Sequence, residues 1–193
     1  MSKRAIFMDR DGTVSDETGY INHIDRYRML PRSIEAIRRI NAAGFLAFVV
    51  TNQSGVARGL FDEALVHEVH GTLSRWLEQG GARLDGIYFC PHHPKEGEPP
   101  WRQDCECRKP RAGMLKRAAR EHDVDLASSY MIGDTVLDIE AARNAGMPGV
   151  LVLTGYGKGD LQFRMARRGL EPAHIAADLL DAVEWILAKE KTA

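Results

Sequence analysis

The chain has 193 residues, of which 44% are hydrophobic and 27% charged, and its 26 Lys plus Arg against 27 Asp plus Glu give a formal net charge of -1. This composition excludes intrinsic disorder, and scattered charges of both signs leave no electrostatic footprint for nucleic acid or an anionic membrane. No apolar run is long enough to cross a bilayer and the amino terminus lacks a secretory pattern, so we expect a cytoplasmic protein with a single domain over residues 1–193.

Short apolar runs alternate with amphipathic stretches along the chain, which predicts a parallel sheet with helices on both faces. The predicted strands are residues 5–8, 45–50, 87–89, 130–132, 150–153 and 174–176. The first two predicted helices begin at Ser33 and Asp62, both good capping residues, and end at glycines 44 and 80–81. Three more helices are predicted at 114–122, 135–145 and 179–189.

Three polar motifs come directly after predicted strands: DRDGT at 9–13, TNQSG at 51–55 and GDTVLD at 133–138. Each motif alone is an ordinary polar turn. However, ligands of open parallel sheets bind beyond the carboxyl ends of the strands, so the acids and amides of the three motifs are expected to face one site.

Two further features bear on that site. A helix beginning near Thr135 would put Asp134 at its amino end and Asp138 one turn later, both facing the same spot. A capping role explains Asp134 without any function, but it does not explain Asp138. Arg108 and Lys109 precede the helix at 114–122; such cations are usually solvated, but beside three carboxylates they become a phosphate clamp.

The three cysteines occur in two short motifs, Cys90-Pro91-His92 and Cys105-Glu106-Cys107. Residues two apart in an extended segment point to the same side, whereas His93 points the other way. Three sulfurs and one nitrogen suit a tetrahedral structural Zn²⁺ with no open position. We therefore interpret residues 90–109 as an inserted zinc loop; free thiols beside an ordinary histidine are the alternative.

In order and spacing, the motifs resemble the haloacid dehalogenase-like (HAD) superfamily of phosphohydrolases, whose pattern is DxDGT, then Thr or Ser, then Lys, then GDxxxD. The resemblance covers nearly the whole chain. It implies a three-layer Rossmannoid sheet without a large cap domain, and Mg²⁺-dependent hydrolysis of a phosphomonoester.

Residue roles follow from the resemblance and from the chemistry of a carboxylate that attacks a phosphate dianion. Asp9 is the predicted nucleophile and Asp11 the general acid and base. Thr51 and Lys109 are expected to stabilise the transferring phosphoryl group. The predicted Mg²⁺ ligands are Asp9, Asp134 and the backbone carbonyl of Asp11, with Asp138 orienting a metal-bound water or Lys109.

The motifs CPHHP and CxCRKP are similar to those of superfamily members that act on a sugar bisphosphate. This resemblance implies a small phosphorylated sugar as the substrate and a role in supplying lipopolysaccharide or surface glycan. We expect the protein to act as a monomer. The matching substrate contacts are Glu17, Thr18, Gly19, Tyr20, Thr51, Asn52, Gln53, Ser54, Arg108 and Lys109. Arg108 would hold the phosphate that is not cleaved, because a guanidinium binds a terminal phosphate in a bidentate manner. Arg58 is a further candidate, although the sequence favours a solvated arginine after a turn.

Three alternatives stay open at this point. Histidinol-phosphate phosphatases share the fold and a zinc loop, so the motifs do not separate the two substrates. A 3'-phosphatase of nucleic acids is disfavoured by the net charge of -1. A zinc-stabilised binding protein would have no need to keep a nucleophile, an acid and a metal site together. Thr135 stands where some members have Lys, and residues 155–168 carry no motif that we can interpret.

Overall fold

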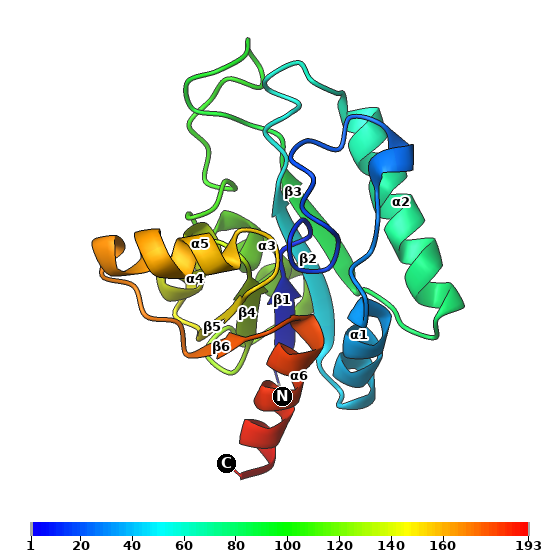
Figure 1. Ribbon diagram of the computed structural model, residues 1–193, viewed down its shortest axis with the longest axis vertical. Helices are drawn as coiled ribbons and strands as arrows, with labels where there is room; N and C mark the ends of the chain where they lie inside the picture. Colours follow the sequence, from blue (N-terminus) through cyan, green and yellow to red (C-terminus); the bar gives the residue numbers. More distant parts are fainter. Residues whose placement is uncertain (1, 193) are drawn as a thin grey trace.

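The computed structural model describes residues 2–192, whose strands form a six-stranded parallel sheet (Figure 1). In chain order the strands are β1 (Ala5–Met8), β2 (Leu46–Asn52), β3 (Gly86–Cys90), β4 (Tyr130–Gly133), β5 (Gly149–Val152) and β6 (His174–Ala176). Their order in space is β3-β2-β1-β4-β5-β6. Every neighbouring pair is parallel, so the carboxyl ends of all six strands lie at one edge of the sheet. Successive strands are added on one side of β1 up to β3 and on its other side from β4 onward, and ligands of open parallel sheets bind where this order switches.

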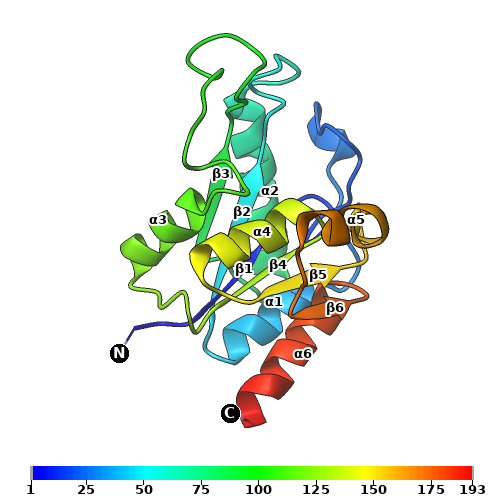
Figure 2. The ribbon, with the colours of Figure 1, turned by 90° about the vertical axis from the view of Figure 1, so that its left-hand side faces the viewer.

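Five helices cover the sheet: α1 (Ser33–Ala42), α2 (Glu63–Gln79), α3 (Gly113–His122), α4 (Val136–Ala145) and α6 (Leu179–Thr192). The buried side chains of α1, α2 and α6 share one apolar cluster, and those of α3 and α4 share another on the opposite face. Figure 2 shows α3 and α4 on the near side of the sheet. The predicted three-layer α/β architecture is confirmed.

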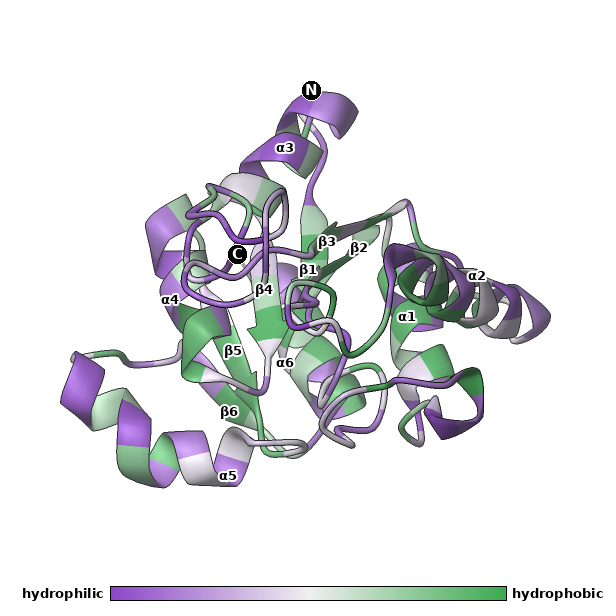
Figure 3. Cartoon of the chain, turned by 90° about the horizontal axis from the view of Figure 1, so that it is seen from above, coloured by the Kyte–Doolittle hydropathy of each residue, from purple (hydrophilic) through white to green (hydrophobic). Residues whose placement is uncertain are grey.

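Alternation within β1 and β2 explains the two apolar layers. Successive residues of a strand face opposite sides, so Ile6 and Met8 join one cluster while Phe7 joins the other. Phe7 stacks on Phe48 with ring centroids 5.2 Å apart. Seen from above, the strands are mainly hydrophobic and the outer faces of the helices hydrophilic (Figure 3). Within the described chain, no helix combines the length and apolarity that a membrane span needs.

All predicted strands and helices are present, with ends within three residues of those expected. One capping prediction is wrong. Ser33 is the first residue of α1 rather than its cap, because its hydroxyl donates to the Val14 carbonyl at 2.9 Å, and the cap position is taken by Arg32 with φ of 70°. Asp62 does cap α2, since its carboxylate accepts from the Leu65 amide.

A helical segment after β5 was not predicted. It begins as α5 (Gly157–Asp160) and continues as irregular helix through Leu161–Met165 and Ala166–Arg168. Two glycines in the first turn weaken the helical pattern, and the buried Met165 packs against α4 and β5 without a regular apolar period. This segment extends away from the sheet in Figure 3.

Loops rather than a further layer rise above the carboxyl edge of the sheet. The longest, between β3 and α3, stands beside the loop that follows β2 in Figures 1 and 2. The two loops are joined by a hydrogen bond from the Ala57 amide to the Pro91 carbonyl at 3.2 Å and by an ion pair of Arg58 with Glu96. The edge of the sheet is therefore walled by segments anchored in neighbouring strands.

Candidate active site

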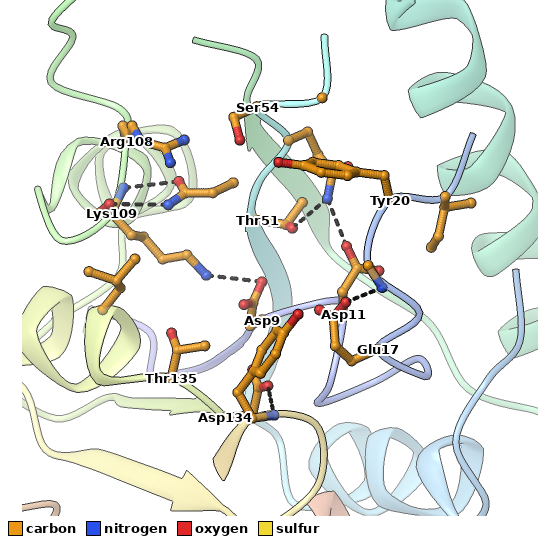
Figure 4. A pocket seen from close by; sticks show the side chains of 17 residues that line it. Asp9, Asp11, Glu17, Tyr20, Thr51, Ser54, Arg108, Lys109, Asp134 and Thr135 are labelled. Atoms are coloured by element: carbon orange, nitrogen blue, oxygen red, sulfur yellow. Dashed lines mark hydrogen bonds and ion pairs between the residues drawn. The ribbon is translucent and has the colours of Figure 1, made fainter. Parts of the chain in front are cut away.

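A cavity of about 280 Å³ opens at the carboxyl edge, where β1, β2 and β4 end (Figure 4). It brings together nearly all of the predicted site residues: Asp9, Asp11, Glu17, Gly19, Tyr20, Thr51, Asn52, Gln53, Ser54, Arg108, Lys109 and Asp134. Thr18 does not line the cavity; its carbonyl instead accepts from the exposed Arg26. Asp138 lies fully buried, directly behind Lys109.

The Lys109 side chain is 3% exposed, and its ammonium has three close partners in the site. The ammonium lies 2.9 Å from Asp9 Oδ1 and 2.6 Å from Asp138 Oδ1, and it donates to the Val50 carbonyl at 2.8 Å. Burial alone would lower the pKa of Lys109, but the two carboxylates raise it above the usual range. The ammonium therefore stays charged and points at the nucleophile predicted from the sequence.

Three carboxylates surround this single ammonium. If Asp9, Asp134 and Asp138 are all ionised, the cluster carries three negative charges against one positive charge, a net charge of -2. Burial raises the pKa of Asp9 to about 7 and, with the charges of Asp138 and Asp9, that of Asp134 to about 9. Asp134 Oδ1 is buried without a hydrogen-bond partner. An oxygen-rich cluster with this charge and an unpartnered carboxylate oxygen fits a divalent cation.

The two acids of GDTVLD make different local contacts, and the helix cap is not formed by Asp134. Thr135, not Asp134, caps α4, and Asp138 completes the capping box by accepting from the Thr135 amide at 3.0 Å and hydroxyl at 2.7 Å. Asp134 has no part in the cap; its Oδ2 accepts from the Tyr156 amide at 2.8 Å. Asp138 therefore completes the helix cap and also contacts the Lys109 ammonium. The sequence analysis predicted that Asp138 orients either a metal-bound water or Lys109, and this contact agrees with the second of these.

Gly12 explains how DRDGT and GDTVLD meet. Its φ is +79°, and a Cβ at this position would overlap the Asp134 carboxylate. Glycine is therefore required both by the left-handed backbone and by the close approach of the second motif. This turn directs Asp9 and Asp11 to the same cavity.

Asp11 is paired with a buried arginine that the sequence analysis did not single out. The Arg10 guanidinium, 1% exposed, donates to Asp11 Oδ1 at 2.9 Å and Oδ2 at 2.8 Å. Burial favours the neutral form of Asp11, but Arg10 outweighs it and holds the pKa of Asp11 below its usual value. Burial also lowers the pKa of His70 to about 3, so its ring is neutral, 3.1 Å from Arg10 Nη1. Its Nε2 can therefore accept from the guanidinium.

TNQSG supplies both a hydroxyl and positioning contacts. Gln53 donates to Asp11 Oδ2 at 2.9 Å and to Thr51 Oγ1 at 3.0 Å, which holds Thr51 at the cavity beside the two acids. The Asn52 side chain exchanges two hydrogen bonds with the main chain of Lys109, at 3.0 and 3.1 Å. These pairs are drawn in Figure 4. Asn52, which was predicted to contact substrate, lines the cavity and also fixes the Lys109 main chain through both polar groups of its amide.

The outer rim holds the remaining predicted contacts. Glu17 accepts from the Gly19 amide at 2.5 Å, and burial raises the pKa of its carboxyl. Tyr20 is 41% exposed. Arg108 donates to the His92 carbonyl at 3.1 Å and lies with Ser54 on the upper side of the cavity in Figure 4. The rim therefore offers a cation and an aromatic ring above the acidic floor.

Sequence reasoning missed several lining residues: Ile21, Gly55, Thr135, Leu137 and Tyr156. The rule that ligands bind beyond parallel strands could have found Tyr156, which follows β5, but no recognised motif marks that strand end. Arg58 does not line the cavity and pairs with Glu96 instead.

The predicted metal-binding side chains of the long loop also come together. Cys107 Sγ lies 3.2 Å from Cys105 Sγ and 3.4 Å from His92 Nδ1, and Cys90 Sγ lies 3.4 Å from Cys105 Sγ. All four ligand atoms are within 4.8 Å of one another. His93 points away, as predicted, and accepts from the Lys95 and Glu96 amides. Three thiols and an imidazole at these separations fit one tetrahedral ion with bonds of about 2.0 to 2.3 Å.

Comparison with known proteins agrees with the fold and the cavity. A family model described as HAD-hydrolase-like matches residues 106–182. The D-glycero-beta-D-manno-heptose-1,7-bisphosphate 7-phosphatase of Pasteurella multocida is 46% identical over 154 residues, 79% of this chain and 83% of that protein. The D-glycero-D-manno-heptose-1,7-bisphosphate 7-phosphatase of Thermosynechococcus vestitus is 42% identical over 190 residues, 96% of both chains. The D,D-heptose 1,7-bisphosphate phosphatase of B. bronchiseptica, solved with magnesium and phosphate, superposes with a TM-score of 0.84 at 39% identity, covering 96% of this chain and 99% of that one.

The parallel sheet, the paired aspartates after β1 and the buried lysine define a phosphohydrolase of the HAD-like class. Within that class, the chain belongs to the family of D-glycero-D-manno-heptose 1,7-bisphosphate 7-phosphatases.

The Arg10–Asp11 pair generates a stability prediction. Arg10→Met should lower the free energy of unfolding by about 3 kcal/mol, because it leaves a mostly buried carboxylate without its partner. Urea denaturation of the metal-free protein measures this loss.

Arg117→Met is the matched control, since Arg117 pairs with Glu121 on the surface of α3 and such pairs contribute less than about 1 kcal/mol. Equal losses of unfolding free energy in the two variants would show that the buried pair stabilises the fold no more than the exposed pair does.

Proposed function

We propose that the chain hydrolyses the 7-phosphate of D-glycero-D-manno-heptose 1,7-bisphosphate and releases heptose 1-phosphate, a step in the supply of activated heptose for lipopolysaccharide or surface glycan. The observation that carries the proposal is the contact of the Asp9 carboxylate with the Lys109 ammonium in the cavity of a chain of this family. The ammonium lets an anionic nucleophile approach an anionic phosphate.

In the first half of the reaction, an Asp9 carboxylate oxygen forms a bond to phosphorus while the bond from phosphorus to the sugar oxygen breaks. The departing alkoxide takes a proton from Asp11. Lys109 and the Thr51 hydroxyl stabilise the charge that develops on the phosphoryl oxygens. The products of this half are an aspartyl phosphate and free sugar phosphate.

In the second half, a water attacks phosphorus and gives its proton to Asp11, and the Asp9–phosphorus bond breaks to release inorganic phosphate. Arg10 holds the pKa of Asp11 low in the free protein. The negative charge of a bound phosphate acts in the opposite direction and raises it, so Asp11 gains its proton as substrate enters.

A magnesium ion is the expected catalytic cofactor, and the B. bronchiseptica relative was solved in complex with magnesium and phosphate. Asp9, Asp134 and the backbone carbonyl of Asp11 would hold it, and Mg²⁺ supplies charge neutralisation for the incoming phosphate. The unpartnered Asp134 oxygen and the close grouping of three carboxylates support this assignment.

A structural zinc ion is the expected occupant of Cys90, His92, Cys105 and Cys107. Four protein ligands leave no position for substrate, so the ion would order the loop rather than take part in chemistry. Arg108 and Lys109 follow Cys107 directly, which means that ordering the loop also positions these two cations. The nucleophile, the general acid and the cation of the proposed reaction lie in one chain, so the reaction as proposed needs no second copy and a monomer suffices for it.

The test of the substrate is phosphate release in the presence of Mg²⁺ from both anomers of the heptose bisphosphate, histidinol phosphate, fructose 1,6-bisphosphate and a 3'-phosphorylated oligonucleotide. We expect one heptose anomer to be preferred at least about a hundredfold in kcat/KM, about 2.7 kcal/mol of transition-state binding. A preference for histidinol phosphate would overturn the substrate and leave the phosphatase chemistry standing.

Asp9→Asn should reduce kcat by at least about a thousandfold, because an amide oxygen is a poor nucleophile toward phosphorus. The control is Asp16→Asn, an exposed acid in the loop after β1 that does not line the cavity. Activity of Asp9→Asn near that of the wild type would refute the nucleophile assignment, provided that both variants melt at similar temperatures.

Cys107→Ser should lose the zinc that metal analysis finds at one ion per wild-type chain, and its Tm should fall by at least about 5 °C. His93→Asn replaces a neighbouring histidine outside the cluster and should keep both zinc and Tm. A zinc-selective chelator should likewise lower Tm more than omission of Mg²⁺ does. Unchanged metal content and Tm in Cys107→Ser would contradict a structural zinc site.

A further inference from the structure

The turn after β5 reaches over the end of β1 and forms a side of the cavity that no predicted motif accounts for. The Thr154 hydroxyl donates to the Gly12 carbonyl at 2.5 Å, and the Tyr156 amide donates to Asp134 Oδ2 at 2.8 Å. Gly155 has φ of +51°, and a Cβ there would overlap both Asp134 and the Gly12 backbone. The turn is thus hydrogen-bonded to both aspartate motifs and is packed so closely against them that it cannot move nearer to either.

The other end of this turn is fixed as well. Asp160, 3% exposed, accepts from the Val136 amide at 2.6 Å, at the first residue of α4. The Asp160 amide in turn donates to the Tyr156 carbonyl at 2.9 Å. Tyr156 therefore sits on a backbone that is held on one side by Asp134 and on the other by the amino end of α4.

The Tyr156 side chain lines the cavity yet is 54% exposed. It is one of two exposed large aromatic residues at the cavity; the other, Tyr20, comes from the loop after β1. Glu17 and Tyr156 both line the cavity, and the charge of Glu17 raises the pKa of the Tyr156 phenol. In Figure 4, Asp134, to which the Tyr156 backbone is bonded, lies on the side of the cavity opposite Arg108 and Ser54.

An exposed aromatic ring on a rigid backbone is suited to ligand contact. It offers a large apolar face at little cost in side-chain entropy and a hydroxyl for a polar partner. The carbon-bound hydrogens of a sugar form an apolar face that can pack on such a ring, while its hydroxyl groups can bond the phenol. The floor of the cavity is polar and is the proposed site of the reacting phosphate, so a contact with the sugar has to come from the walls.

We propose that Tyr156 is a substrate-contact residue that packs against the sugar of the bisphosphate and so helps to select the substrate. The inference rests on the proposed function, because it presumes a sugar bisphosphate as the ligand. The backbone amide of Tyr156 positions Asp134 and is kept in every side-chain variant, so the contribution of the ring can be measured separately from that of the metal-binding acid.

The test compares kcat and KM for the heptose bisphosphate and for acetyl phosphate, a phosphoryl donor without a sugar. Tyr156→Ala should raise KM for the bisphosphate at least tenfold, with kcat and the acetyl phosphate kinetics within about threefold of the wild type. Tyr156→Phe keeps the ring and should recover most of the loss. The control is Phe163→Ala, which removes an exposed aromatic ring from the helical segment that follows Tyr156. Phe163 does not line the cavity, so this variant should match the wild type on both substrates.

Two results would overturn the proposal while the function stands. Tyr156→Ala could hydrolyse the bisphosphate with the wild-type KM, or it could lose activity equally on both phosphoryl donors, which would mean that Tyr156 acts only through Asp134. A wild-type protein that hydrolyses acetyl phosphate but not the heptose bisphosphate would instead refute the proposed substrate, and the sugar contact with it. The two failures are therefore distinguishable.

Discussion

The geometry of the site depends on one buried ammonium. Lys109 reaches from the end of the cysteine-containing loop to the Val50 carbonyl in β2, to Asp9 after β1 and to Asp138 in α4. A buried ammonium is stable only while its carboxylate partners surround it. The single charge consequently fixes the relative positions of three parts of the sheet and the loop, and the rest of the site is arranged around it.

Each acid of the first motif is paired with a cation: Asp9 with the Lys109 ammonium and Asp11 with the Arg10 guanidinium. Asp9 shares Lys109 with Asp138, so its negative charge is only partly compensated and its pKa rises to about 7, chiefly through burial. Asp11 has Arg10 to itself and stays ionised. Two carboxylates separated by one residue thus have different proton affinities in the metal-free protein. A bound cation would lower the pKa of the nucleophile Asp9 and a bound phosphate would raise that of the proton donor Asp11, which brings each acid to the protonation state that its proposed role needs.

Most of the fold and the centre of the site could be predicted from the sequence because both follow local rules. Apolar runs placed the strands, and the motifs after those runs placed Asp9, Thr51 and Asp134. What escaped prediction depends on tertiary contacts. The preference of aspartate for helix caps does not reveal that Thr135 caps α4 while Asp138 completes the box. Nothing near Tyr156 in the sequence shows that its amide meets Asp134, 22 residues away.

The walls of the cavity are loops whose ends are held by the sheet, by hydrogen bonds such as that from Thr154 to Gly12, and by the thiol cluster. They differ in this respect from a domain that swings over a bound ligand and must swing back. Residues 2–192 contain no separate domain of that kind, so the proposed reaction does not need a domain to close before chemistry and to reopen after it. Where no domain encloses the ligand, unsuitable phosphates are free to enter the cavity, and selectivity depends on how fast each one leaves compared with how fast it reacts.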